Sequence, residues 1–179
     1  MTTILIAPFS NSGIRDWPGS HFSALIGLIL PRVAADAIVY VTGTASHRLR
    51  ANEIVRAHPA DRVVNLAGRQ SRDAMIRLLK TADGAVVNNS GMAHLGGYFG
   101  IPTVSIFAGT HQRREWRALG GSVMLVTRAI GCSPCQLDHG QTSPYNKACL
   151  RQITPGQVAD ALFANMKRVS AMRNGSIAA

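Results

Sequence analysis

Acidic residues are scarce in this chain. Its 179 residues include 19 Lys and Arg but only 9 Asp and Glu, so the formal net charge is +10 at pH 7. This balance favours anionic partners, namely a phosphorylated ligand, nucleic acid or an anionic membrane surface. Aromatic residues make up only 6%, and no helix-turn-helix, zinc-finger or aromatic-rich stacking motif is present. We therefore expect no nucleic-acid partner.

Long apolar runs and a full set of paired cysteines are also missing. The chain has no run of eighteen apolar residues, so we expect no membrane span. Its first residues, MTTILIAPF, are too short and uncharged for a signal peptide and are typical of a strand. Three cysteines cannot all pair with one another. A cytoplasmic protein in a reducing compartment is the prediction that follows.

What is present is an alternation of strand and helix patterns. Short apolar runs predict six strands, at 3–8, 37–41, 63–66, 84–87, 103–107 and 123–126. Helical spacing and cap residues predict helices at 20–30, 47–57, 71–80, 92–99 and from Thr154 to about Arg168. This alternation predicts an α/β fold, with a Rossmann-like parallel sheet of about six strands and helices on both faces.

The length predicts one domain, residues 1–170. Within it, 131–152 is expected to be an irregular loop that carries the cysteines. Residues 171–179 are expected to follow the domain as a frayed tail. Ser20 is predicted to cap the first helix. The last helix has the clearest start, because Thr154 is a typical N-cap, Pro155 suits the first position, and Gln157 completes a capping box.

The central stretch, residues 84–110, is GAVVNNSGMAHLGGYFGIPTVSIFAGT. It predicts a strand, a tight turn, a helix and a second strand, joined as a right-handed βαβ unit. Ligands of such units lie beyond the carboxyl ends of the strands. Ser90 is expected to cap the helix, and Gly91 to let a ligand approach the backbone. The free N–H groups of a helix N-terminus suit a phosphate.

Residues 88–110 resemble the signature of family 9 glycosyltransferases, the heptosyltransferases that build the lipopolysaccharide inner core. That signature is roughly D-[ST]-G-x-x-H-x-A-x-x-x-x-x-P-x-[VL]-x-[LI]-[FY]-G-x-[TS], and Asn89 stands where Asp is usual. Two further blocks resemble the family in order and spacing, FSNSGIRDWP and NLAGRQSRDAMIRLLKTAD. The matching residues of the signature are Ser90, Gly91, His94, Pro102, Phe107 and Thr110.

The resemblance implies the carboxyl-terminal, donor-binding half of a GT-B glycosyltransferase. The implied ligand is a nucleotide-diphospho-sugar such as ADP-heptose, used in lipopolysaccharide or surface glycan synthesis. The family's amino-terminal acceptor domain, which supplies a catalytic Asp, has no counterpart in this sequence. We therefore expect no catalytic residue here, no required cofactor, and an acceptor-domain protein or a second copy as partner.

Two alternatives stay open beside this interpretation. The chain is an enzyme only if an acceptor domain completes it, and the alternative is a non-catalytic nucleotide-sugar-binding or partner protein. Peripheral contact with the anionic inner face of the bacterial inner membrane is also open. The basic group Arg113, Arg114 and Arg117 is either a solvated face or a surface for the phosphorylated acceptor or the missing domain.

The resemblance assigns donor-binding roles residue by residue. Arg15 lies in the loop after the first strand, where the family has a Lys or Arg that neutralises the departing diphosphate; the alternative is a solvated loop cation. Ser10 and Asn11 fall where family members use hydroxyl residues on the same phosphates. Ser46 stands near a position that is often acidic and binds a ribose. The other donor-site candidates are Asn89, Ser90, Gly91, Met92, His94 and Thr110.

Cysteines in the loop 131–152 form a second constellation. Cys132 and Cys135 are spaced as CxxC, and Cys149 follows further along. This is a common metal-ligand spacing, and His139 is the candidate fourth ligand. Some members of the resembled family bind a metal ion in such a run. A structural metal ion is therefore one expectation, and reduced thiols or a CxxC disulfide are the alternatives.

Overall fold

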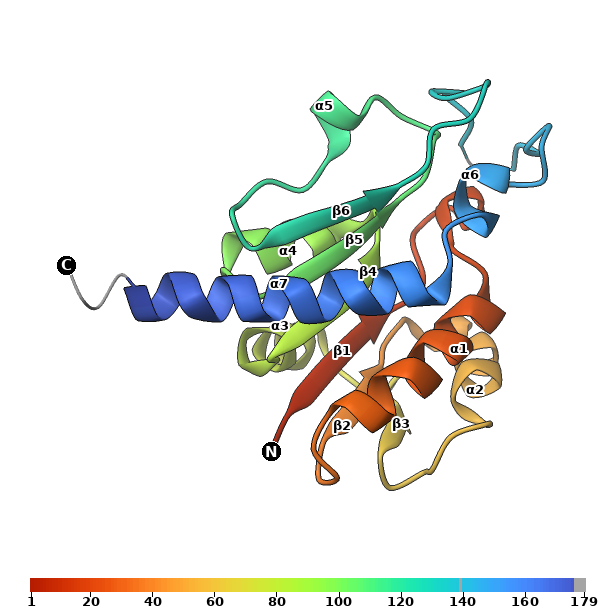
Figure 1. Cartoon of the computed structure of the whole chain (residues 1–179). Helices are drawn as coiled ribbons and strands as arrows, with labels where there is room; N and C mark the ends of the chain where they lie inside the picture. The colour runs from red at the N-terminus through yellow and green to blue at the C-terminus, as the bar shows by residue number, and fades with distance from the viewer. Residues whose placement is uncertain (139, 176–179) are drawn as a thin grey trace.

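A single parallel sheet of six strands forms the centre of the molecule in the computed structural model, which describes residues 1–138 and 140–175 (Figure 1). The strand order is β3-β2-β1-β4-β5-β6, and every neighbouring pair is parallel. The predicted α/β sheet is thereby confirmed. The strands are β1 (Thr3–Ala7), β2 (Ile38–Val41), β3 (Val63–Asn65), β4 (Gly84–Asn88), β5 (Thr103–Phe107) and β6 (Val123–Thr127).

Helices cover both faces of this sheet. One face packs against α1 (Gly19–Ile29), α2 (Arg48–Val55) and α7 (Pro155–Gly175), and the long α7 crosses the front of the sheet in Figure 1. The opposite face packs against α3 (Arg72–Thr81) and α4 (Gly91–Tyr98). Two short helices, α5 (Arg113–Trp116) and α6 (Ala148–Arg151), lie in the long connections near β6. No helix among the described residues is long and apolar enough to cross a membrane.

Alternating side chains of the strands build two separate cores. Ile4 and Ile6 of β1 point to the α1 and α7 side, whereas Leu5 and Ala7 point to the α3 and α4 side. All four are buried. Because both faces of the sheet are covered, the strands are continuous apolar runs rather than runs of alternating polarity, as parallel strands usually are.

The start of α7 confirms the predicted capping box. The Thr154 amide donates to Gln157 Oε1 at 2.9 Å, and the Gln157 amide donates to Thr154 Oγ1 at 3.3 Å. The helix does not end near Arg168, however, and 171–175 are helical rather than a frayed tail. Its apolar face continues to the buried Val169, and Arg173 donates to the Gly100 carbonyl at 2.7 Å. The remaining predicted tail, residues 176–179, lies outside the described residues.

Two other local predictions are corrected. Ser20 does not cap α1, because the helix begins at Gly19 and the Pro18 carbonyl accepts from the amides of His21 and Phe22 at 3.0 and 3.2 Å. The loop 131–152 is not wholly irregular, since α6 interrupts it. Within α6, Leu150 is fully buried in the core, which fixes this end of the loop.

The strand order places a switch point between β1 and β4. From β1 the chain adds β2 and β3 to one side, and then crosses to add β4, β5 and β6 to the other. The loops that leave β1 and β4 therefore diverge at the carboxyl edge of the sheet. Such a crevice is the usual ligand-binding place of an open α/β sheet.

Candidate functional site

A cavity of about 860 Å³ opens at this switch point. It lies at the carboxyl ends of β1, β2 and β3 and beside the first turn of α4. Polar residues of the loop after β2 and apolar residues of α3 and α4 share its wall. The lining residues are Ala7, Phe9, Ser10, Asn11, Thr42, Gly43, Thr44, Ala45, His47, Gly68, Gln70, Ser71, Arg72, Met75, Ile76, Ser90, Gly91, Met92 and Leu95.

Ser90 and Gly91 form the part of the wall where α4 begins. Ser90 occupies the N-cap position, but its hydroxyl makes no capping hydrogen bond. Its Oγ is buried and has no hydrogen-bond partner among residues 1–138 and 140–175. A Cβ built on Gly91 would meet no protein atom within 4 Å. The space beside Gly91 at the first turn of α4 is therefore open, and next to it lies a buried hydroxyl without a partner among the described residues.

Arg15 lies in the short 3₁₀-helix that follows β1 (Gly13–Arg15). Its side chain is buried, with Nη2 donating to Asn11 Oδ1 and lying 3.7 Å from Asp138 Oδ1. Its Nε is buried and has no hydrogen-bond partner within the described part of the chain. Asn11 lines the cavity, so the Arg15 cation is held directly behind the cavity wall. The alternative of a solvated loop cation does not apply, because Arg15 is 8% exposed.

Asp16 organises the loop that carries Arg15. This aspartate is 2% exposed. Its Oδ1 accepts hydrogen bonds from the Ser10 amide at 2.7 Å and the Ser10 hydroxyl at 2.8 Å. Its Oδ2 accepts from Arg50 Nη2 of α2 at 3.0 Å. A buried carboxylate that accepts this many hydrogen bonds holds the loop after β1 in one conformation.

Asn88, at the end of β4, ties the same loop to the sheet. Its Nδ2 donates to the Pro8 carbonyl at 2.6 Å and lies 3.5 Å from Asp16 Oδ1. Its Oδ1 accepts from the Trp17 amide at 3.2 Å. The indole of Trp17 in turn donates to the Ile153 carbonyl at 3.1 Å. The two loops that diverge at the switch point are thus held together by buried, fully engaged polar groups.

The cavity brings together five of the ten predicted donor-site residues. Ser10, Asn11, Ser90, Gly91 and Met92 line it. Ser10 shares its hydroxyl with the Ser12 carbonyl and Asp16, which indicates that it shapes the loop. The other five do not line the cavity. They are Arg15, Ser46, Asn89, His94 and Thr110.

Those five differ in their surroundings and in their contacts with residues of the cavity wall. Ser46 hydrogen-bonds Thr44, a lining residue, through its hydroxyl at 2.8 Å. Asn89 is buried next to Ser90. His94 is exposed on α4. Thr110 is buried after β5, where its hydroxyl lies 2.9 Å from His111 Nδ1.

His47 is a lining residue that the motifs did not indicate. Its ring stacks on Phe9 with 4.5 Å between centroids, and its Nδ1 lies 3.0 Å from the Thr44 hydroxyl. Burial lowers the pKa of His47, the nearby Arg50 cation lowers it further, and Asp16 partly offsets both. His47 is therefore neutral at pH 7, and its imidazole contributes hydrogen-bonding atoms to the cavity rather than charge. Its place after a strand at the carboxyl edge was the available signal.

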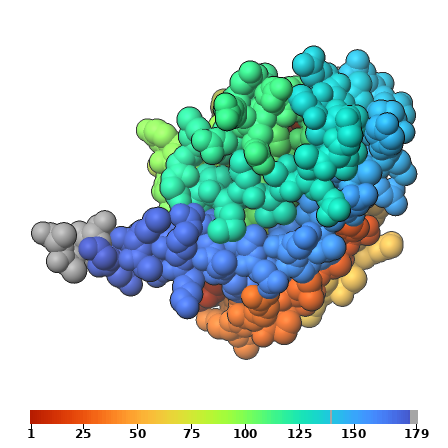
Figure 2. Space-filling model, turned by 45° about the horizontal axis from the view of Figure 1, so that its top comes forward, coloured from red at the N-terminus to blue at the C-terminus, as the bar shows by residue number. Residues whose placement is uncertain are grey.

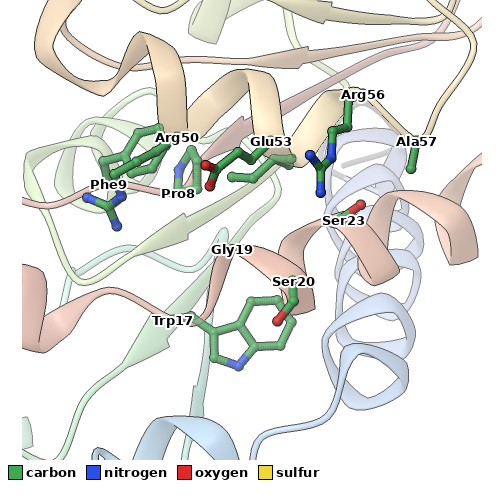
Figure 3. A pocket seen from close by; sticks show the side chains of 11 residues that line it. Pro8, Phe9, Trp17, Gly19, Ser20, Ser23, Arg50, Glu53, Arg56 and Ala57 are labelled. Atoms are coloured by element: carbon green, nitrogen blue, oxygen red, sulfur yellow. The ribbon is translucent and has the colours of Figure 1, made fainter.

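A second hollow, of about 460 Å³, lies on the other side of Phe9 (Figure 3). Figure 3 shows side chains of α2 reaching toward it from one wall and those of α1 from the other. Arg50 lies over the Phe9 ring, 4.7 Å from its centroid, and bonds Asp16 behind it. Phe9 and Arg50 thus form the partition between this hollow and the cavity at the switch point.

The cysteine loop gives a mixed outcome. Burial raises the pKa of the Cys132 thiol, and its neighbours Cys135 and Cys149 raise it further. Cys149 is buried and accepts from the Gly109 amide at 3.4 Å. Within the described residues, no three His, Cys, Asp or Glu side chains form a group that could hold a metal ion. His139, the predicted fourth ligand, lies outside them.

Comparison with a protein-family model gives a match over residues 2–146, to glycosyltransferase family 9 (heptosyltransferase). This range holds the cavity, the Arg15 loop and the start of α4. The comparison with curated proteins found no match.

Solved structures of similar fold include heptosyltransferases. Escherichia coli ADP-heptose lipopolysaccharide heptosyltransferase II is 21% identical, with a TM-score of 0.77 over 93% of this chain and 47% of that one. A family 9 glycosyltransferase from Veillonella parvula is 13% identical, with a TM-score of 0.73 over 93% and 46%. E. coli heptosyltransferase WaaC, solved with ADP, is 20% identical, with a TM-score of 0.63 over 76% and 40%. The chain thus spans about half the length of the heptosyltransferases it matches.

Proposed function

Because the chain belongs to glycosyltransferase family 9, the heptosyltransferase family, we propose that it binds the nucleotide-diphospho-sugar donor of such an enzyme. The ligand class is that of ADP-heptose, with which a family structure, the E. coli TibC heptosyltransferase, has been solved. The observation that supports the proposal most is the buried Ser90 hydroxyl, which has no partner among the described residues and lies at the start of α4 in the cavity wall.

In this proposal the diphosphate binds where α4 begins. The first amides of a helix have no intrahelical partner and lie at the positive end of the helix dipole, so they suit phosphate oxygens. Ser90 Oγ adds a donor at the same place. Gly91 leaves room for the phosphate, because it carries no side chain on the face that opens to the cavity.

Arg15 provides the positive charge that the diphosphate needs. Bond cleavage at the sugar leaves a nucleoside diphosphate with an additional negative charge, and a nearby guanidinium stabilises that charge more in the transition state than in the bound donor. Nε of Arg15, which is buried and has no hydrogen-bond partner among the described residues, is the atom proposed for this, since Nη2 donates to Asn11 and lies 3.7 Å from Asp138 Oδ1. Asn11, on the cavity wall, would share the same phosphate.

The nucleoside then extends toward β2 and β3. Met75 and Ile76 of α3 offer an apolar surface for a base, and Thr44 and its partner Ser46 offer hydroxyls for a ribose. These groups lie on the β2 and β3 side of the switch point, opposite the α4 side where the diphosphate would bind. A nucleoside diphosphate would therefore span the cavity from one side to the other.

Sugar transfer also needs a base that activates the acceptor. In the proposal it comes from an acceptor domain, as part of lipopolysaccharide or surface glycan synthesis at the cytoplasmic side. The chain's half-length match to heptosyltransferases supports this division. A second candidate, a nucleotide-sugar-binding protein without turnover, is favoured by Asn89, which lacks the charge of the Asp usual at this position of the family signature. Transfer of labelled sugar by the isolated chain would exclude this second candidate, and it would also contradict the proposal that the base comes from an acceptor domain.

Calorimetric titration of ADP and adenosine tests the donor site. We expect Arg15→Ala to weaken ADP binding roughly tenfold or more, because a charge-assisted hydrogen bond contributes about 1.5–3 kcal/mol. Adenosine has no phosphate, so its affinity should stay unchanged. Arg77→Ala, at an exposed position of α3 away from the cavity, is the matched control and should alter neither.

Two results would count against the proposal. If wild type binds neither ADP nor ADP-heptose, the donor-binding function itself is wrong. If Arg15→Ala weakens ADP and adenosine equally, Arg15 acts on the loop and not on the diphosphate. Circular dichroism of each variant separates these outcomes from loss of the fold.

A further inference from the structure

The segment between β5 and β6 forms a fixed projection on the surface. Figure 1 shows α5 standing away from the sheet beyond β6. Residues 112–117 are all exposed, whereas Ala118 is buried in the core on the α4 side. The backbone of Leu119 packs directly on α4, because a Cβ on Gly97 would lie 1.9 Å from the Leu119 carbonyl oxygen. The projection is thus anchored at Ala118 and Leu119, and its other side chains face outward.

Large apolar side chains are exposed on this projection and beside its anchor. Trp116 is 50% exposed and Leu119 is 67% exposed. Tyr98, next to Gly97 on α4, is 82% exposed. Trp116 lies against His111, with 4.9 Å between ring centroids. Large apolar side chains exposed on one projection, as Trp116 and Leu119 are, are typical of a binding site.

Positive charge surrounds these apolar side chains. Between positions 111 and 128 the chain has four arginines and a single acidic residue, Glu115. Arg113 and Arg117 also line a hollow of about 560 Å³ beside β6, which Arg168 of α7 closes from the other side. Arg168 Nε is buried and unpaired within the described residues. Figure 2 shows the blue-green residues around β6 lying directly against the blue α7 on this face.

We infer that this projection, formed by residues 112–119 and Tyr98, docks on an anionic phospholipid surface. Tryptophan and tyrosine have an apolar body and a polar tip, and they favour the interface between lipid headgroups and acyl chains. Arginines beside them bind headgroup phosphates, and the hollow at Arg113, Arg117 and Arg168 gives one phosphate a defined place. A second copy of the chain is disfavoured as the occupant, because it would bring like charges together. The inference does not depend on the donor site.

Vesicle binding tests the inference, and the fluorescence of the two tryptophans reports on it. The chain has two tryptophans, and Trp17 is buried whereas Trp116 is half exposed. We expect the protein to sediment with vesicles of phosphatidylcholine and phosphatidylglycerol, but not with phosphatidylcholine alone. Tryptophan emission should shift to shorter wavelength on binding. In Trp116→Phe the shift should vanish while binding persists, because phenylalanine keeps an apolar ring there.

Charge variants show whether vesicle binding depends on this local surface or on the net charge of the whole protein. Replacing Arg113, Arg114 and Arg117 together by Gln should weaken vesicle binding about 100-fold, since each basic residue near an anionic surface contributes about fivefold. The matched control replaces three exposed arginines elsewhere and removes the same charge. These are Arg56, Arg77 and Arg151.

We expect the control to bind nearly as well as wild type. Equal loss in both triple variants would overturn the inference in favour of a diffuse charge effect. Binding that needs no phosphatidylglycerol, or no binding at all, would overturn it too. The absence of an emission shift in wild type would place the contact elsewhere on the protein.

Discussion

Two groups of polar side chains lie at the same edge of the sheet and differ in how fully they are paired. Asp16 and Asn88 are buried and use their polar atoms in hydrogen bonds to the chain itself. Ser90 and Arg15, each within two residues of that pair, keep a buried polar atom with no partner among residues 1–138 and 140–175. Such an atom is costly to bury unless something binds it.

We interpret the paired groups as those that stabilise this edge of the sheet, and the groups with an unpaired atom as those that bind a ligand. Loss of a paired group should destabilise the fold, because its former partners become unsatisfied in the interior. Loss of an unpaired group should leave stability nearly unchanged and reduce ligand binding. Each prediction below tests one side of this contrast.

The largest effect is expected for Asp16→Ala. The substitution leaves the Ser10 amide and hydroxyl without their carboxylate acceptor, so we expect a loss of roughly 3 kcal/mol in the free energy of unfolding. Urea denaturation measures this loss. Asp36→Ala is the control, since Asp36 is exposed and 3.8 Å from the N-terminal amine, and it should change stability by about 0.5 kcal/mol or less. Equal results for the two would remove Asp16 from the paired group.

Gly91→Val comes next, and it should act on binding alone. A Cβ at Gly91 meets no protein atom within 4 Å, and its φ is not in the left-handed region, so we expect a stability change of about 0.5 kcal/mol or less. The branched side chain would occupy the space of the diphosphate, and ADP binding should fall below detection. Gly121→Val is the control, because Gly121 has the same open surroundings outside the cavity. A folded Gly91→Val that binds ADP as wild type does would move the phosphate away from α4.

Ser90→Ala tests the contrast at a smaller scale. An N-cap serine usually stabilises its helix by about 1 kcal/mol, but Ser90 makes no capping bond. We therefore expect unchanged stability and ADP affinity about three- to tenfold weaker, as for one neutral hydrogen bond. Thr154→Ala should show the reverse, because Thr154 does cap α7. Calorimetry measures the ADP affinity of both variants, and urea denaturation measures their stability. A loss of stability in Ser90→Ala would contradict the assignment of Ser90 to ligand binding.

The place of Ser90 could be predicted from the sequence, and the bonds of the paired group could not. Ser90 and Gly91 lie in a local strand-turn-helix pattern, so their place at the carboxyl edge follows from a few neighbouring residues. The bonds of Asp16 join it to Arg50 and bring it close to Asn88, 34 and 72 positions away. No local pattern reports such partners, and an aspartate in a polar loop usually faces water. A scarce acidic residue between Arg15 and Trp17 was the one available signal.

Helix ends show the same limit. The capping box at Thr154 depends on three neighbouring positions and is confirmed. The extension of α7 beyond Arg168 depends on Arg173 reaching the Gly100 carbonyl, a contact across 73 positions. At the start of α1, amides of the first turn donate to the carbonyl of Pro18, although serine is the residue type usually preferred at an N-cap and Ser20 lies two positions later.

The smallest effect concerns His47, a residue of the cavity wall whose pKa is influenced by Asp16 of the paired group. Burial and the Arg50 cation lower the pKa of His47, and Asp16 raises it less. Because the pKa of His47 in the folded protein lies below the ordinary histidine value of about 6.5, the unfolded chain takes up this proton first as the pH falls. The stabilisation is thus fully present above about pH 6.5 and is lost as the pH falls toward the folded pKa.

NMR titration should place the imidazole pKa of His47 below 6.5 in wild type and higher in Arg50→Gln, which removes the repelling cation. Urea denaturation should show a weaker decline of stability between pH 7.5 and pH 5.5 in His47→Gln than in wild type, with the remaining decline due partly to His58, whose pKa burial also lowers. A wild-type pKa at or above 6.5 would mean that Asp16 outweighs burial and Arg50 together at the imidazole, and that the charge of the paired group extends into the cavity.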